Sequence, residues 1–236
     1  MARKDIKIIL IVDKLLYAMT PYLVNLCQAK TRQMHIGIAG NIGSGKSTLT
    51  RMLAEHYGWI PQYEAVTYNP YLEDYYKDIK RWSFNLEVYF LAQRFKDLLE
   101  ISKSDKVIIQ DRTMMEGVYI FVKNNLKLGN ISQRDYDTYM QLFNMMLSTV
   151  KLPDLLIYLK SSVASLVAKI QKRGRDYEQG MSLEYLGGLN ESYEEWIASY
   201  PGKVITIDAD NMDFENNPED FRYITDRIDA LLFGLF

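Results

Sequence analysis

A glycine-rich loop directly after a short apolar segment constrains the fold of this 236-residue chain more than any other feature. Residues 40–47 have the sequence Gly-Asn-Ile-Gly-Ser-Gly-Lys-Ser, and they follow the apolar run Met34–Ala39. Small residues between Gly40 and Gly45 allow successive backbone N–H groups to converge on phosphate oxygens, and a following helix directs its positive end at them. The sequence therefore predicts a strand, a phosphate-binding loop and a helix, in that order.

The positions of this G-x-x-x-x-G-K-S loop have separate expected roles. Lys46 supplies a positive charge for the β- and γ-phosphate oxygens of a nucleoside triphosphate, and the Ser47 hydroxyl is placed to bind a magnesium ion. We therefore expect a nucleoside triphosphate together with Mg²⁺ as the ligand. The expected ATP-binding residues of the loop are Gly40, Asn41, Ile42, Gly43, Ser44, Gly45, Lys46, Ser47 and Thr48.

Composition indicates one globular domain in a reducing compartment. Hydrophobic residues make up 48% of the chain, which is enough to bury one sizeable core. The single cysteine, Cys27, has no partner in the chain, and one cysteine with two histidines cannot build a metal cluster. A net charge of -2 gives no overall basic field, which argues against a nucleic acid as the main partner. We expect a cytoplasmic protein that does not bind a membrane.

The N-terminal residues have a separate interpretation. The apolar run Ile6–Val12 is too short to span a bilayer, because charged residues interrupt it at once. The small-residue cleavage pattern of a secretory signal does not follow it. Because the strand that leads into the phosphate loop starts at Met34, we predict that this residue is the native start. Residues 1–33 are then an extension, and residues 34–236 form the catalytic domain.

Short apolar segments alternate with helical stretches along the rest of the chain. This alternation predicts an α/β fold with a buried parallel sheet. The expected strands are Met34–Ala39, Trp59–Tyr63, Lys106–Gln110, Leu155–Lys160 and Lys203–Ile207. The expected helices include Lys46–Tyr57, Arg81–Ile101, Gln133–Val150 and a last helix from about Phe221 to Leu232.

Polar residues at the carboxyl ends of these strands are candidates for catalysis, because ligands of open α/β sheets bind at that edge. Glu64 follows the second strand and is a candidate general base for an acceptor hydroxyl; the alternative is a solvated loop carboxylate. Asp111 ends the third strand and is expected to contact the magnesium ion or one of its ligands. Arg112 would hold an oxygen of the acceptor or of the phosphoryl group. The alternative is that Asp111 and Arg112 form an ion pair with a structural role.

Two arginines near the end of a later helix are candidates for a lid. Arg173 and Arg175 flank Gly174 and can bring guanidinium groups to the oxygens of a transferring phosphoryl group. The alternative is a basic helix end that complements the helix dipole.

Glu87 and Arg94 lie seven residues apart on one predicted helix, hence on one face and about 10.5 Å apart at 1.5 Å per residue. That separation suits the edge of a flat base. The alternative is a pair of ordinary surface charges. Tyrosines between positions 63 and 76 can stack on a ligand or simply pack.

The chain resembles the deoxynucleoside kinase family from about Met34 to its C-terminus. Four segments carry the resemblance: GNIGSGKST, WSFNLEVYFLAQRF, QDRT and RGRDYEQGMSLEYL. The likeness is greatest to bacterial purine-directed members. It implies a P-loop kinase with a five-stranded parallel sheet in the order 2-3-1-4-5, a homodimer, and transfer of the γ-phosphoryl group of ATP to the 5′-hydroxyl of a deoxynucleoside in nucleotide salvage.

The resemblance also implies roles for single residues. It makes Glu64 the general base, although some accounts of the family give that role to the acid at the position of Asp111. The acidic–arginine pair falls on Asp111 and Arg112, and the sugar-binding tyrosine falls on Tyr76. The two lid arginines are followed by a lid carboxylate, Glu178, which meets the 3′-hydroxyl on closure.

Two departures from the family pattern concern the base. The family commonly has Gln at the position of Glu87 and Asp at the position of Gly117. Since a carboxylate only accepts hydrogen bonds, Glu87 would suit the N1–H and N2–H groups of guanine or the N6 amine of adenine. Arg94 could donate to O6 and N7 of guanine, unless Glu116 restrains it. We expect a purine deoxynucleoside, with deoxyguanosine favoured over deoxyadenosine.

Thymidylate kinase, or another nucleoside monophosphate kinase, is the nearest alternative. It places an arginine just before the carboxylate that follows the second strand, where this chain has Tyr63, so an uncharged 5′-hydroxyl fits better. A GTPase-like switch would need N-K-x-D and D-x-x-G segments, and neither occurs in the sequence.

Overall fold

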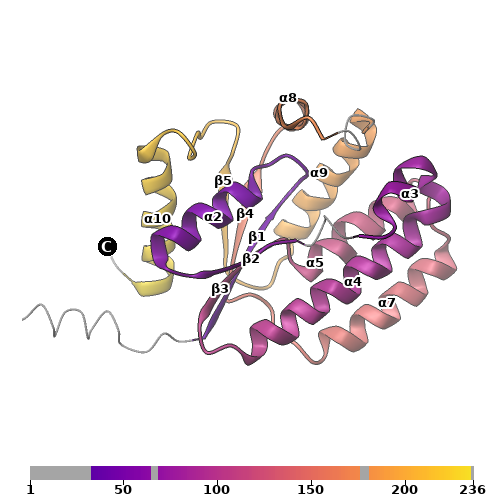
Figure 1. The fold of residues 1–236 in the computed structure, drawn as a ribbon, viewed down its shortest axis with the longest axis horizontal. Coiled ribbons are helices and arrows are strands. Elements are labelled where there is room, and N and C mark those ends of the chain that lie inside the picture. Colours follow the sequence, from indigo (N-terminus) through magenta and orange to yellow (C-terminus); the bar gives the residue numbers. More distant parts are fainter. Residues whose placement is uncertain (1–32, 65–68, 176–180, 235–236) are drawn as a thin grey trace, which may run out of the picture. The chain divides into compact units, whose positions relative to one another are not determined.

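Five parallel strands form the central sheet in the order β2-β3-β1-β4-β5 (Figure 1). The structure is a computed structural model that describes residues 33–64, 69–175 and 181–234. The strand order predicted by the resemblance is confirmed. The strands are β1 (Met34–Gly40), β2 (Ile60–Gln62), β3 (Val107–Asp111), β4 (Leu155–Lys160) and β5 (Val204–Asp208).

The predicted strands agree with these bounds except at their ends. The edge strand β2 is shorter than expected because it pairs with β3 alone and contains Pro61, which a sheet accepts at an edge. β3 extends to Asp111, which therefore stands in the sheet opposite Ile38 of β1. The interpretation of residues 1–33 as an extension falls almost wholly outside the described residues and stays a prediction.

Helices cover both faces of the sheet (Figure 1). One face packs against α2 (Lys46–Tyr57) and α10 (Pro218–Phe233) in a core that includes Ile36, Ile38 and Ile109. The other face packs against helices that carry much of the site, in a core that includes Tyr158 and Tyr193. These helices are α4 (Ile79–Lys103), α5 (Met114–Glu116), the π-helix η1 (Gly117–Val122), α7 (Gln133–Leu147) and α9 (Leu183–Ala198). The remaining helices of the described part are α3 (Leu72–Lys77), α6 (Lys123–Lys127) and α8 (Val163–Arg173).

Local signals explain where these helices begin and end. α2 has its predicted bounds, and Gly58 closes it in the left-handed conformation with φ 68°. α4 starts two residues earlier than predicted because Asp78 caps it, accepting a hydrogen bond from the Arg81 N–H at 3.0 Å. α7 ends at Leu147, and the N–H groups of Thr149 and Val150 donate to carbonyls three positions back. Among the described helices, no helix is both long and apolar enough to cross a bilayer.

Candidate active site

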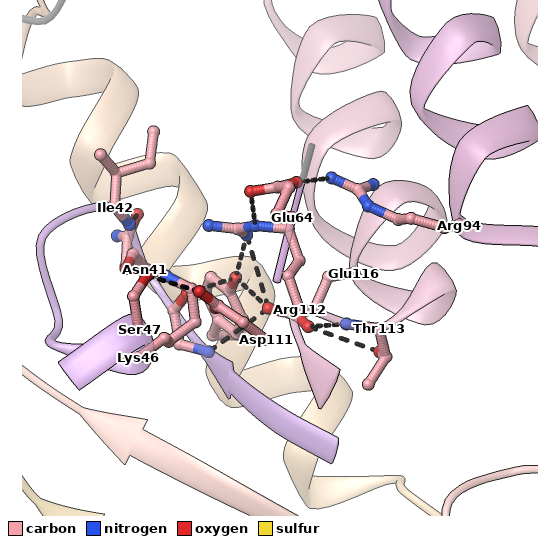
Figure 2. A network of polar contacts seen from close by, with 12 residues as sticks. Asn41, Ile42, Lys46, Ser47, Glu64, Arg94, Asp111, Arg112, Thr113 and Glu116 are labelled. Carbon is pink, nitrogen blue, oxygen red and sulfur yellow. Dashed lines mark hydrogen bonds and ion pairs between the residues drawn. The ribbon is translucent and has the colours of Figure 1, made fainter. Parts of the chain in front are cut away.

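The phosphate loop connects β1 to α2 and has the backbone that its glycines predict. Gly43 and Gly45 adopt φ values of 84° and 95°, a region that glycine enters without steric cost. The Lys46 Nζ donates to the Asn41 carbonyl at 2.9 Å, which closes the loop on itself (Figure 2). Burial, followed by the charge of Arg112, lowers the pKa of Lys46 to about 8. The conformation of the loop is therefore held by its own contacts.

Asn41 ties this loop to α9, a contact that sequence reasoning did not find. Its side-chain amide donates to the Leu186 carbonyl at 3.1 Å and to the Asn190 side chain at 2.6 Å. Its side-chain oxygen accepts from the Ile42 N–H at 2.7 Å. Because α9 lies far along the chain, no local pattern indicates this contact.

Ser47 and Asp111 meet where α2 begins beside the end of β3. The Ser47 hydroxyl donates to Asp111 Oδ2 at 2.5 Å, and Asp111 Oδ1 is buried without a hydrogen-bond partner among the described residues (Figure 2). Hydroxyl and carboxylate oxygens are ligands that Mg²⁺ prefers. Within the same residues no three His, Cys, Asp or Glu side chains gather as a metal cluster. The pair thus fits an ion that takes other ligands from nucleotide phosphates and water.

Glu64 lies between two arginines. It accepts hydrogen bonds from Arg94 Nη2 and, at 3.0 Å, from Arg112 Nε (Figure 2). Burial on its own would raise the pKa of Glu64, but Arg112 and Arg94, helped by Lys46, outweigh it and lower the pKa to about 2. The carboxylate is therefore charged at every pH near neutral, and the solvated-loop alternative is wrong.

Arg112 adopts φ 70°, the one positive φ outside glycine in the described part of the chain. Its backbone N–H donates to the Ile38 carbonyl at 3.0 Å, which holds the turn after β3 against β1. Its guanidinium donates to Glu64, to Glu116 at 3.4 Å and to the Tyr193 hydroxyl at 3.0 Å. The alternative, an ion pair between Asp111 and Arg112, does not occur among the described residues, where Arg112 pairs with Glu64 and Glu116 instead.

Glu116 is fully buried and joins the phosphate loop to the turn after β3. It accepts from the Gly40 N–H at 3.3 Å, the Thr113 N–H at 2.7 Å and the Tyr193 hydroxyl at 2.7 Å. The alternative that Glu116 restrains Arg94 is wrong, because its cation is Arg112. The spacing of Thr113 and Glu116 is that of a capping box, a signal that could have identified this residue. Tyr193 has no such signal.

Glu87 and Arg94 are both buried on α4 and face one cavity, so the surface-charge alternative is wrong. They do not act as a pair. Arg94 bonds to Glu64, and its Nε and Nη1 atoms are buried without a hydrogen-bond partner among the described residues. A Cβ atom on Gly117 would lie 2.9 Å from Arg94 Nη1. The glycine at this position therefore leaves the room that the guanidinium occupies.

The surroundings of Glu87 favour a neutral carboxyl group. Its Oε1 accepts one hydrogen bond, from Asn125 Nδ2 at 3.2 Å. Burial raises the pKa of Glu87 to about 8, and the charge of Arg94 does not compensate. The expectation that Glu87 accepts hydrogen bonds from guanine stays a prediction.

One cavity of about 300 Å³ brings together predicted residues from six segments of the chain. Aromatic side chains, among them Phe90, Phe121 and Tyr185, form its walls. Arg173, the last residue of α8, reaches it together with Arg175. Glu178 lies outside the described residues. The predicted site residues that line the cavity are Ile42, Gly43, Lys46, Ser47, Glu64, Tyr76, Glu87, Arg94, Asp111, Arg112, Arg173 and Arg175.

A second hollow adjoins the phosphate loop. Ser44, Gly45 and Thr48 line it, and Arg173 and Arg175 are common to both hollows. The loop thus lies between the hollow that contains Glu64 and the second hollow.

Comparison with known proteins gives consistent matches. A profile of the deoxynucleoside kinase family matches residues 36–232. The chain is 38% identical to the deoxyadenosine/deoxycytidine kinase of Bacillus subtilis strain 168, over 84% of this chain and 92% of that protein. It is 34% identical to the deoxyguanosine kinase of the same organism, over 84% of this chain and 97% of the relative. A solved structure of deoxyadenosine kinase from M. mycoides, with dCMP and dCDP bound, matches with a TM-score of 0.75 at 34% identity, over 84% of this chain and 100% of that one.

Proposed function

The chain belongs to the deoxynucleoside kinase family and is an ATP-dependent kinase, and we propose that it phosphorylates the 5′-hydroxyl of a purine deoxynucleoside for nucleotide salvage. The convergence of Lys46, Glu64 and Arg94 on one cavity carries this proposal. Arg94 Nε and Nη1 have no hydrogen-bond partner among the described residues, and they favour a purine because a purine offers the ring acceptor N7, which a pyrimidine lacks. Relatives named as deoxyadenosine and deoxyguanosine kinases add support.

Glu64 is our candidate for the group that holds the 5′-hydroxyl. As a carboxylate it accepts the hydroxyl hydrogen bond and takes the proton as the phosphoryl group is transferred. Its low pKa makes it a weak base, but a loose transition state demands positioning and charge stabilisation more than early proton removal. Arg112 fixes its direction at 3.0 Å. We assign the base role to Glu64 rather than Asp111, because Asp111 is already bonded to Ser47.

At the phosphate end, the loop N–H groups and Lys46 would hold the β- and γ-phosphates of ATP. Ser47 and Asp111 would hold Mg²⁺, which when bound neutralises charge on the phosphates. Arg173 and Arg175 would close over the phosphoryl group as a lid.

The sugar would bind beside Tyr76, with Glu178 meeting the 3′-hydroxyl on closure. This assignment rests on the family resemblance, and on the position of Tyr76 in the wall of the cavity.

A homodimer in the cytoplasm, with residues 34–236 as the catalytic domain, completes the proposal. The homodimer is proposed from the resemblance to the deoxynucleoside kinase family. The single cysteine of the chain supports a reducing compartment such as the cytoplasm. Deletion of residues 1–33 should leave phosphorylation intact.

A substrate panel tests the function. The full chain is incubated with ATP and Mg²⁺ and with deoxyadenosine, deoxyguanosine, deoxycytidine, thymidine or thymidine monophosphate, and the products are separated by chromatography. We expect the purine monophosphates to form fastest, and Lys46→Met to abolish product. Preference for deoxycytidine over both purines would overturn the purine assignment, and phosphorylation of the monophosphate alone would overturn the nucleoside assignment.

A further inference from the structure

Glu87 is a buried carboxyl group that faces the base end of the cavity without a cation of its own. It is 4% exposed, and no ion pair to it occurs among the described residues. Its one hydrogen bond in this part of the chain comes from the neutral amide of Asn125, at 3.2 Å to Oε1. Oε2 therefore has no protein donor there and remains available to a ligand in the cavity.

The charged and titratable groups around Glu87 do not offset the cost of burying an anion. The charges of Arg94 and Arg112 favour the anion, but Arg94 forms its hydrogen bond with Glu64 and none with Glu87 among the described residues. Most of the other groups are phenols that stay neutral, because burial raises their pKa values. The groups that influence Glu87, element by element, are Tyr75 of α3, Arg94 of α4, Glu64 after β2, Arg112 after β3, Tyr139 of α7 and Tyr185 of α9.

A lone buried carboxylate is costly, whereas a buried carboxylic acid with a hydrogen-bonded carbonyl oxygen is not. The geometry therefore favours the protonated side chain, with Asn125 donating to Oε1 and the hydroxyl on Oε2. Burial also raises the pKa of Glu87 to about 8.

We propose that Glu87 recognises the base as a neutral carboxylic acid, donating one hydrogen bond and accepting another, and thereby selects deoxyadenosine over deoxyguanosine. This inference rests on the proposed function of the same site. Adenine offers a ring nitrogen that accepts beside an N6–H group that donates, which matches a hydroxyl beside a carbonyl oxygen. Guanine offers two donors, N1–H and N2–H, and one of them would face the hydroxyl proton. A site built around such a pair rejects the mismatched base.

The protonation of one residue then sets the selectivity. At pH 7 the neutral acid favours deoxyadenosine, and above the pKa of Glu87 the carboxylate accepts from both donors of guanine. With a pKa of about 8, kcat/KM for deoxyadenosine should fall about tenfold between about pH 7 and pH 9, and kcat/KM for deoxyguanosine should rise about tenfold. The ratio of the two therefore changes about a hundredfold.

The experiment measures kcat/KM for both nucleosides with the full chain, ATP and Mg²⁺, from about pH 6.5 to about pH 9.5. Three proteins are compared: wild type, Glu87→Gln and Glu100→Gln. Glutamine keeps a hydrogen-bond donor beside an acceptor but does not titrate. In Glu87→Gln the ratio of the two kcat/KM values should therefore not change with pH. Glu100 lies on the same helix and is exposed, so Glu100→Gln should keep the wild-type pH dependence.

Asn125→Leu gives an independent measurement if Glu87→Gln does not fold. Loss of the amide donor removes a contact that lowers the pKa of Glu87, so the pH at which selectivity changes should move upward. The inference is overturned if the wild-type ratio of the two kcat/KM values does not change with pH. It is also overturned if the ratio changes at the same pH in Asn125→Leu as in wild type. In both cases the kinase assignment stands. If neither purine is phosphorylated at any pH, the proposed function fails and the inference fails with it.

Discussion

The two ends of the cavity contain one glutamate each, and the two differ in charge. At the end proposed for the sugar and phosphate, Glu64 contacts Arg94 and Arg112 and has its pKa lowered to about 2. At the end proposed for the base, Glu87 contacts a neutral amide and has its pKa raised to about 8. Burial acts in the same direction on both carboxyl groups. The position of the guanidinium groups therefore decides which glutamate is an anion.

The difference suits the chemistry proposed for each end. Phosphoryl transfer requires fixed charge around the reacting oxygens. Base recognition requires hydrogen bonds of defined direction, which a neutral acid provides. Arg94 connects the two ends, because it lies on the same helix as Glu87 and bonds to Glu64.

The largest expected effect is loss of the charged glutamate. Glu64→Gln should lower kcat by about 10²- to 10⁴-fold, because the 5′-hydroxyl loses its proton acceptor. Steady-state phosphorylation of deoxyadenosine measures this, with Glu55→Gln as a matched control on the exposed face of α2. If Glu64→Gln phosphorylates deoxyadenosine as fast as wild type, the charge of Glu64 is not needed for catalysis, and the proposed difference in role between the two glutamates fails.

Removal of the shared arginine should act on both ends together. Arg94→Gln takes a positive charge from Glu64 and Glu87, so both pKa values should rise, that of Glu64 by about one to three units. The acid limb of the plot of kcat/KM against pH should then move to higher pH, into the range that can be measured. An unmoved acid limb would mean that Arg112 alone keeps Glu64 charged.

The base end should also make folding stability depend on pH. Glu87 has a folded pKa of about 8, above its ordinary value of 4.5, so the folded protein keeps a proton that the unfolded chain releases. The free energy of unfolding should therefore fall as pH rises between these values, by up to about 1.4 kcal/mol per pH unit. Urea unfolding of wild type and Glu87→Gln measures this, and an equal slope in the two proteins would contradict it.

The smallest effect concerns the room beside Arg94. Gly117→Ala places a Cβ atom 2.9 Å from Arg94 Nη1 and 3.1 Å from the Tyr139 hydroxyl, so we expect a loss of about 1 kcal/mol in unfolding free energy. Gly187→Ala in α9 meets no atom within 4 Å and should instead gain about 0.5 to 1 kcal/mol. Thermal unfolding measures both variants. If Gly117→Ala and Gly187→Ala change the unfolding free energy equally, the space beside Arg94 accepts a methyl group without cost.

Local sequence predicted the phosphate end of the molecule well. The G-x-x-x-x-G-K-S loop, the helix after it and Asp111 at a strand end follow from short segments, because their function depends on neighbours in the chain. The lengths of α4 and α7 were less accurate, because their ends depend on a cap at Asp78 and on turns after Leu147. The contacts of Asn41 and Tyr193 were missed, since they join segments about 150 residues apart.

The sequence by itself determined the family, the phosphate loop and many of the polar residues that line the cavity, because short segments of the chain specify these features. The tertiary structure alone decided which carboxyl group is charged. That choice depends on where Arg94 and Arg112 direct their guanidinium groups after folding, and in a buried site a few ångströms separate an ion pair from a lone acid.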